Sequence, residues 1–187
     1  MAEDRAPAAS GGAPGSASAR LVEFARTCRP PETALAATRA SLFDWAACAI
    51  AGTGEPVADV VRAQIAAEGG AAQASVTGLA AMQVPARAAA LANGAISHAL
   101  DYDDTHFAHV GHPSVAVIPA ALAVAGRQGA DGAACLRAAL IGAEASIRVG
   151  MWLGEPHAAA GFHTTATAGT FGATLAAGLL AGLDAER

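Results

Sequence analysis

Apolar side chains return every three or four positions through residues 32–51, and this spacing is the strongest constraint on how the chain can fold. A helix repeats about every 3.6 residues, so the spacing gathers these side chains on one buried face. Hydrophobic residues make up 53% of the 187 residues and aromatic ones only 4%. A core of Ala, Leu and Val lets helices approach closely, which favours a helical bundle over a β-sandwich. The residues that carry the pattern are Leu35, Leu42, Trp45, Ala46, Ala49 and Ile50.

Similar apolar segments follow one another along the chain, separated by short links that contain Gly, Pro or polar residues. Residues 20–187 are expected to form one domain, because this length is enough to bury a core. Residues 1–19 are rich in Ala, Gly, Pro and Ser and are interpreted as a disordered leader. One segment, 73–79, has an extended pattern. The predicted fold class is all-α, a helical bundle, with helices near 21–27, 32–51, 57–68, 85–100, 113–125, 131–153 and 164–183.

The last of these segments contains no charged residue from Thr164 to Leu183, which is close to the length of a membrane-spanning helix. Its side chains are mainly Ala, Gly and Thr, so a buried helix is the better interpretation and no membrane contact is expected. Three glycines lower its helix propensity by roughly 1 kcal/mol each relative to Ala. They predict close contact with another helix or, alternatively, with a ligand. These glycines are Gly169, Gly172 and Gly178.

The charged and sulfur-containing side chains exclude several kinds of chemistry and partner. All eleven basic residues are arginines, so the chain supplies no lysine for a Schiff base or for acid–base work. A net charge of −5 without a basic cluster argues against a nucleic-acid partner. The three cysteines form no CxxC pair, and Cys48 and Cys135 fall within apolar helical patterns. A reducing cytoplasm is therefore the expected compartment.

Residues 93–114, NGAISHALDYDDTHFAHVGHPS, concentrate the polar chemistry of a chain that is only 14% charged. Asp101 follows the apolar run that ends at Leu100, where a helix leaves the core, and is interpreted as functional. Asp103 is expected instead to cap a turn or to pair with a surface arginine. Carboxylates and imidazoles at the edge of an apolar core can bind a polar substrate and move its protons. The segment holds Asp101, Asp103, Asp104, His98, His106, His109 and His112.

A metal site is the alternative interpretation of this segment. His106, His109 and His112 lie three residues apart, and imidazoles with nearby carboxylates bind zinc or iron well. The spacing is neither HExxH nor HxH, and Gly111 and Pro113 make a poor helical context for His112. No metal and no cofactor are therefore predicted.

Two histidines stand directly before predicted helices. His112 precedes Pro113 and Ser114, and His163 precedes Thr164 in the sequence GFHTT. The exposed N–H groups of a helix start favour an anion, so two such starts can converge on one carboxylate. His157 is interpreted as a surface or supporting residue.

These motifs resemble the MmgE/PrpD family, which includes 2-methylcitrate dehydratase and cis-aconitate decarboxylase. The resemblance rests on residues 93–106, 112–114, 142–148 and 161–173, with 42–52 similar to an early helix of the family. It implies a helical domain joined to a smaller α+β domain, dimerisation, and metal-independent chemistry on di- or tricarboxylates. Family active-site positions match Asp101, Thr105, His112 and His163, which are the predicted catalytic residues. Asp104, His106 and Thr164 are predicted as further substrate-binding residues.

The chemistry of these side chains suggests their roles in a lyase or isomerase that abstracts a proton beside a carboxylate or carbonyl. His112 and His163 would bind a substrate carboxylate or shuttle protons. Asp101 would orient a histidine or act as a base, and Thr105 would donate a hydrogen bond. The expected ligand is a small di- or tricarboxylate.

The resemblance covers only the helical portion of the family, incompletely and without the α+β domain. Family members also draw lysine and tyrosine side chains from later parts, which this chain does not contain. Three hypotheses follow: a split enzyme completed by a second chain that supplies the C-terminal half, a repurposed homologue, or a truncated remnant. A non-catalytic binding or association module is the alternative function. Because an incomplete bundle exposes apolar surface, a homo-oligomer or heteromer is expected.

Overall fold

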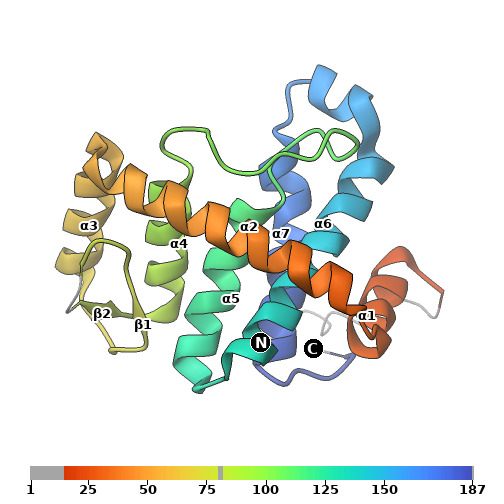
Figure 1. Cartoon of the computed structure of the whole chain (residues 1–187), viewed down its shortest axis with the longest axis horizontal. Coiled ribbons are helices and arrows are strands. Elements are labelled where there is room, and N and C mark those ends of the chain that lie inside the picture. Colours follow the sequence, from red (N-terminus) through yellow and green to blue (C-terminus); the bar gives the residue numbers. More distant parts are fainter. Residues whose placement is uncertain (1–14, 80–81, 187) are drawn as a thin grey trace, which may run out of the picture.

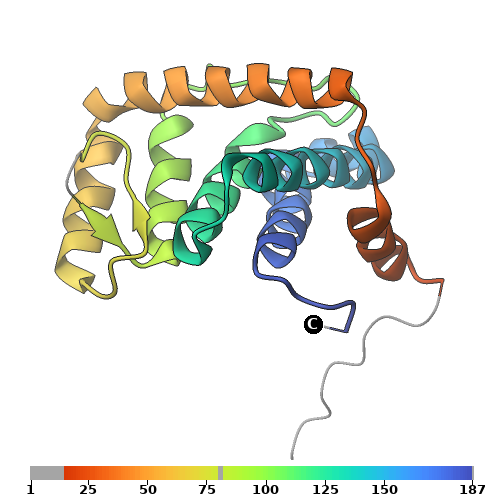
Figure 2. The ribbon, with the colours of Figure 1, turned by 60° about the horizontal axis from the view of Figure 1, so that its bottom comes forward.

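The long helix α2 (Glu32–Ala51) lies across one side of a helical bundle in the computed structural model, which describes residues 15–79 and 82–186. Figure 1 shows α2 passing in front of the other helices, and Figure 2 shows them arranged beneath it. Helices α4, α5 and α6 contact α2 directly. The predicted all-α fold class is confirmed, and helix 32–51 has the predicted bounds.

Several helices begin at residues whose side chains or ring geometry suit a helix start. Ser16 Oγ accepts the Ala19 N–H at 3.2 Å at the start of α1 (Ala17–Thr27). Pro56 occupies the first position of α3 (Pro56–Glu68), where its missing N–H is not needed. Asp131 caps α6 (Gly132–Ala159), as the sequence predicts, by accepting the Ala134 N–H at 2.7 Å.

The first helix corrects one predicted boundary. It starts at Ala17, so residues 17–19, which we assigned to the leader, are helical. Residues 1–14 of that leader lie outside the described part of the chain.

Four other helices end at different residues from those predicted. Helix α5 (Ser114–Gln128) extends beyond the predicted residue 125, and helix α7 (Thr164–Leu180) stops before the predicted residue 183. Helix α4 (Ala86–Ser97) stops before the predicted residue 100, because residues 98–100 form a turn. Helix α6 continues past the predicted end near 153, but Gly154 interrupts it with a φ of 68°. Helical geometry resumes beyond this kink and carries Pro156 in its first turn.

Close packing of α7 (Thr164–Leu180) against α5 (Ser114–Gln128) and α6 explains two of the three glycines noted in the sequence. A Cβ at Gly172 would collide with Ser146 Oγ and the Gly142 carbonyl of α6. A Cβ at Gly169 would lie 2.7 Å from Ala116 Cβ on α5. The helix-contact prediction is confirmed for Gly169 and Gly172, whereas Gly178 meets only Leu183, at 3.7 Å.

The described residues contain one small β-sheet, which is a two-stranded antiparallel hairpin. β1 (Ala74–Ser75) pairs with β2 (Gln83–Val84), so the predicted extended segment at 73–79 contributes one short strand. Val76 and Val84 of this hairpin are buried with Ile65 and Ile96 in one apolar cluster. A second cluster holds Trp45 against α5, α6 and α7. None of the described helices is both long and apolar enough to cross a bilayer.

Candidate functional site

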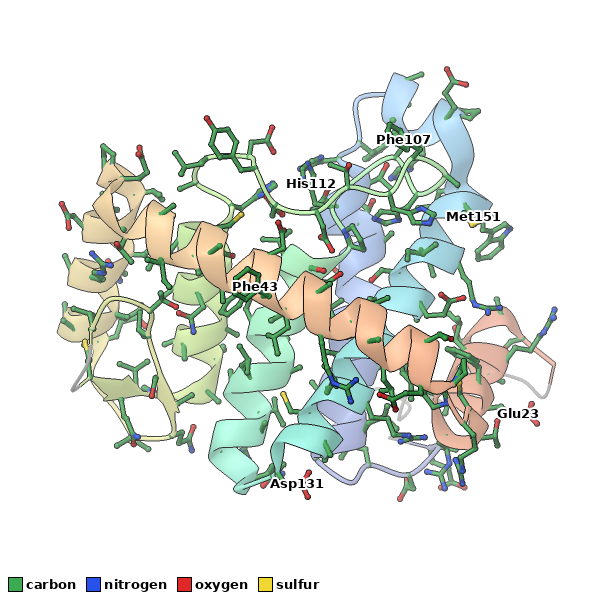
Figure 3. All side chains as sticks on the ribbon, viewed as in Figure 1. Glu23, Phe43, Phe107, His112, Asp131 and Met151 are labelled. Carbon is green, nitrogen blue, oxygen red and sulfur yellow. The ribbon has the colours of Figure 1, made fainter. Side chains whose placement is uncertain are left out.

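The segment between α4 and α5 carries most of the polar side chains that the sequence singles out. Figure 1 shows it leaving α4 and passing toward the ends of α6 and α7, and Figure 3 places His112 and Phe107 on it. Val110 has a φ of 55°, which is uncommon for a β-branched residue. On either side of Val110, the His106 N–H donates a hydrogen bond to the Gly111 carbonyl at 3.0 Å, as in a β-bridge. This pairing closes a turn around Val110.

Asp103 lies at the centre of the segment, with its side chain fully buried. Its Oδ1 is 2.7 Å from His98 Nδ1, and its Oδ2 is 3.4 Å from His112 Nδ1. Its backbone carbonyl is 3.0 Å from the same His112 Nδ1. The sequence assignment of Asp103 to a surface cap or an arginine pair is wrong. A carboxylate is expensive to bury, and here the two imidazoles supply its polar contacts.

Asp101 lies on the open side of the same two histidines, with a side chain that is 76% exposed. Its Oδ1 is 3.3 Å from His112 Nε2 and 3.7 Å from His98 Nε2. Asp101 has a φ of 57°, a left-handed conformation that Asp tolerates better than most residues. A carboxylate and an imidazole at this separation, open to solvent, can exchange a proton with each other and with a ligand.

The start of α7 meets this segment at two points. Thr165 Oγ1 accepts the His112 N–H at 3.0 Å. The exposed His163 ring stacks on the His98 ring, with centroids 6.3 Å apart and planes 19° apart. The two predicted helix starts, at Ser114 and Thr164, are therefore brought together.

The remaining predicted site residues lie elsewhere. Thr105 lines a hollow of about 400 Å³ between the segment, α2 and α6, together with Asp104 and His106. His106 Nδ1 accepts the His109 N–H at 3.2 Å. The Thr164 side chain is buried, and its Oγ1 has no hydrogen-bond partner among the described residues. A substrate contact for any of these four stays a prediction.

Asp104 ties the segment to two helices. Its Oδ1 accepts the Ser114 N–H at 3.2 Å, and its Oδ2 accepts the Ser114 hydroxyl at 2.5 Å. Its own N–H donates to Asp44 Oδ2 of α2 at 3.0 Å. In this conformation both carboxylate oxygens are engaged at the start of α5.

Two further titratable groups near the site are held neutral. Burial lowers the pKa of His109, which is completely inaccessible, and the neighbouring His106 and His112 lower it further. Burial raises the pKa of the Cys48 thiol, and Asp44, Asp103 and Asp104 add to that effect. Neither group is poised to act as an ion.

Four side chains of this region could supply the ligands of a metal ion. His98, Asp101, Asp103 and His112 each place one ligand atom within 4.8 Å of the others. Two imidazoles and two carboxylates suit zinc or iron. This set shares only His112 with the three evenly spaced histidines considered from the sequence. A metal here would compete with the His98–Asp103 hydrogen bond for one or both of these side chains.

Sequence reasoning gave no role to His98 and a wrong one to Asp103, and it did not foresee the contact of Thr165 with His112. A local signal existed for the first of these: His98, Asp101 and Asp103 are spaced so that one turn after α4 folds both carboxylates back toward the imidazole. The contact of Thr165 spans 53 positions of sequence and had no such local signal.

One of two comparisons with known proteins supports the family resemblance. A comparison with curated proteins finds no match for this chain. A sequence model of the MmgE/PrpD N-terminal domain matches residues 17–187, which is nearly the whole chain. The chain therefore belongs to the MmgE/PrpD family and corresponds to the N-terminal domain of that family.

Proposed function

We propose that this domain forms part of a lyase or isomerase that abstracts a proton from a small di- or tricarboxylate. The family implies a dehydratase- or lyase-like activity. The observation that carries the proposal is the contact between the Asp101 carboxylate and His112 Nε2, at 3.3 Å on an exposed side of the molecule. Two polar groups at that distance can share and release one proton.

The hydrogen bonds of His112 determine which nitrogen is available for chemistry. Its Nδ1 lies 3.0 Å from the Asp103 carbonyl, which can only accept, so Nδ1 carries the hydrogen. In the neutral ring, Nε2 then holds the lone pair that faces Asp101 and solvent. His112 can thus take a proton from a substrate carbon, and Asp101 can orient the ring or accept the proton.

His163 and Thr105 complete the proposed set. His163 is exposed at the start of α7, where backbone N–H groups favour a substrate carboxylate. Thr105 would donate a hydrogen bond to substrate, which requires the ligand to reach the hollow that Thr105 lines. The proposed chemistry uses no metal and no cofactor.

We further propose that another polypeptide contributes to the complete site. The chain has no lysine, so a cation that neutralises a second substrate carboxylate must be an arginine, a protonated histidine or a group from another chain. A homo-oligomer or a heteromer with a chain supplying the C-terminal half, in a cytoplasmic setting, fits this requirement.

Proton abstraction can be tested without knowing the final product. Purified protein, alone and with a candidate partner chain, is incubated in D₂O with a panel of di- and tricarboxylates, and NMR follows loss of the C–H signals. We expect exchange with at least one compound, and a fall of about 10²-fold or more in His112→Ala. The matched control His157→Ala should keep the wild-type rate. Equal exchange in wild type and His112→Ala would reject this function.

A non-catalytic association module is the second candidate. It is supported by large apolar side chains that are exposed on the 98–113 segment and on α6, among them Phe107 at 94% and Trp152 at 76%. Oligomerisation with no carboxylate exchange, in the presence of every partner chain, would favour this function.

A further inference from the structure

His98 occupies the middle of the polar cluster, although no role was predicted for it from the sequence. Its ring centroid is 4.9 Å from that of His112, edge to face, and 6.3 Å from that of His163. It therefore contacts the rings from both helix starts. Its side chain is 27% exposed, so the ring is accessible from outside.

Asp103 determines the orientation of this ring. The fully buried Asp103 carboxylate lies 2.7 Å from His98 Nδ1, which is the shorter of its two histidine contacts. An ionised carboxylate only accepts, so His98 Nδ1 carries the hydrogen. The lone pair of the neutral ring is then on Nε2, which points to Asp101.

The two Nε2 atoms consequently face one carboxylate oxygen. Asp101 Oδ1 lies 3.3 Å from His112 Nε2 and 3.7 Å from His98 Nε2. Neither histidine uses its Nε2 in a described hydrogen bond to a main-chain group. Two imidazoles with free Nε2 atoms and a carboxylate between them form a symmetric acid–base pair with a route for proton return.

We propose that His98 is the acid–base partner of His112 and that Asp103 is the residue that positions it. This inference rests on the proposed function. In an elimination, His112 Nε2 takes the proton from the carbon, and the C–H electron pair becomes the new C=C bond. The leaving hydroxyl departs with its bonding electrons and takes the Nε2 proton of His98 in its imidazolium form, so that water forms and the His98 ring becomes neutral. Asp101 Oδ1 then carries the proton from His112 back to His98.

The role of His98 as the catalytic acid is tested by measuring C–H exchange and elimination separately. With a carboxylate found in the D₂O panel, His98→Gln should lower elimination by about 10²-fold or more, because its acid is lost. Exchange should stay within about threefold of wild type, because His112 is intact, and KM should change by less than about threefold. Loss of both reactions, or of neither, in folded His98→Gln protein would overturn the proposal.

The positioning role of Asp103 is tested by histidine NMR. This measurement needs no substrate, so its result is independent of the proposed function. In ¹⁵N-labelled protein without substrate, at a pH at which the ring is neutral, His98 should show a protonated Nδ1 and a bare Nε2. Asp103→Ala should convert His98 to a mixture of tautomers and leave His112 unchanged, because the main-chain carbonyl that holds His112 is kept.

Two further variants serve as a rescue control and as a replacement for Asp103→Ala. Asp103→Asn should restore the wild-type His98 tautomer, because its amide oxygen can still accept from Nδ1–H. Asp103→Ser, which shortens the side chain while keeping it polar, replaces Asp103→Ala if that protein does not fold. An unchanged His98 tautomer in a folded Asp103→Ala or Asp103→Ser protein would overturn the positioning role.

Discussion

At the scale of single residues, the tightest packing is that of the His109 ring against Gly150 of α6. The ring is fully buried, and neither ring nitrogen makes a hydrogen bond of good geometry to a described residue. Gly150 leaves the space that the ring occupies, because a Cβ at that position would collide with His109 Nδ1. The packing of the 98–113 segment on α6 thus depends on a glycine at position 150.

Replacing Gly150 with alanine should therefore destabilise the domain. We expect Gly150→Ala to lower the free energy of unfolding by about 1–3 kcal/mol, as overpacking in a filled core does. Urea denaturation followed by circular dichroism measures the change. Gly132→Ala is the control on the same helix, since a Cβ there meets nothing within 4 Å. Equal stability of the two variants would show that the His109 ring does not pack against Gly150.

The burial of His109 also predicts how stability depends on pH. Its pKa is lowered by burial from the ordinary 6.5, so below that value the unfolded chain binds a proton that the folded one does not. Stability should fall as pH drops below about 6.5, by at most ~1.4 kcal/mol per pH unit from this group, until the folded pKa is passed. Urea midpoints between pH 7.5 and 5.5 should show a smaller loss in His109→Gln than in wild type. The control His157→Gln should follow wild type, and an identical loss in His109→Gln would contradict the argument.

At the scale of elements, the 98–113 segment is held by side chains rather than by regular structure. Asp104 joins it to the start of α5 and to Asp44 of α2, and Thr165 joins it to α7. These bonds hold Asp101 and His112 beside the ends of three helices.

Removing the Asp104 carboxylate tests this anchoring. Asp104→Ala should lower the free energy of unfolding by about 0.5–2 kcal/mol, the usual cost of losing a helix-start acceptor. Asp104→Asn should lose less, because its amide oxygen still accepts one hydrogen bond. Thermal unfolding compares both with Asp131→Ala, which removes the side-chain cap of α6 instead. A melting temperature of Asp104→Ala equal to that of wild type would show that Asp104 does not anchor the loop.

The elements were largely predictable from the sequence because their signals are local. The spacing of Leu35, Leu42 and Trp45 marks α2, and Asp131 marks the start of α6. The site was less predictable, because its central feature is burial. Nothing local distinguishes buried Asp103 from exposed Asp101, and only the path of the chain past α7 decides which carboxylate turns inward.

At the scale of the whole molecule, the later part of α6 lies far from α3 (Figure 1). Trp152 and Met151 of α6 are exposed, and Figure 3 shows Met151 on the outer side of that helix. Of the two tryptophans, Trp45 is buried and Trp152 is 76% exposed. Trp152 fluorescence can thus report whether this end of the molecule is covered in solution.

We expect the domain to associate through this end. Sedimentation velocity across a dilution series should show a concentration-dependent oligomer, with the fluorescence shifting to the blue on association. Trp152→Gln should weaken association by about tenfold or more, as loss of a central aromatic anchor does. Val60→Thr, at a position of α3 that is 67% exposed, is the control. A monomer at every concentration would contradict this expectation.

The most direct test of the central claim, that two helix starts form one carboxylate site, is a ligand titration followed by histidine NMR. A carboxylate that exchanges in D₂O, or citrate if none does, is added to ¹⁵N-histidine-labelled protein. The ring signals of His98, His112 and His163 should shift together along one binding curve, and those of His157 should not move. Shifts of His112 and His163 with different dissociation constants, or of neither, would contradict a shared site.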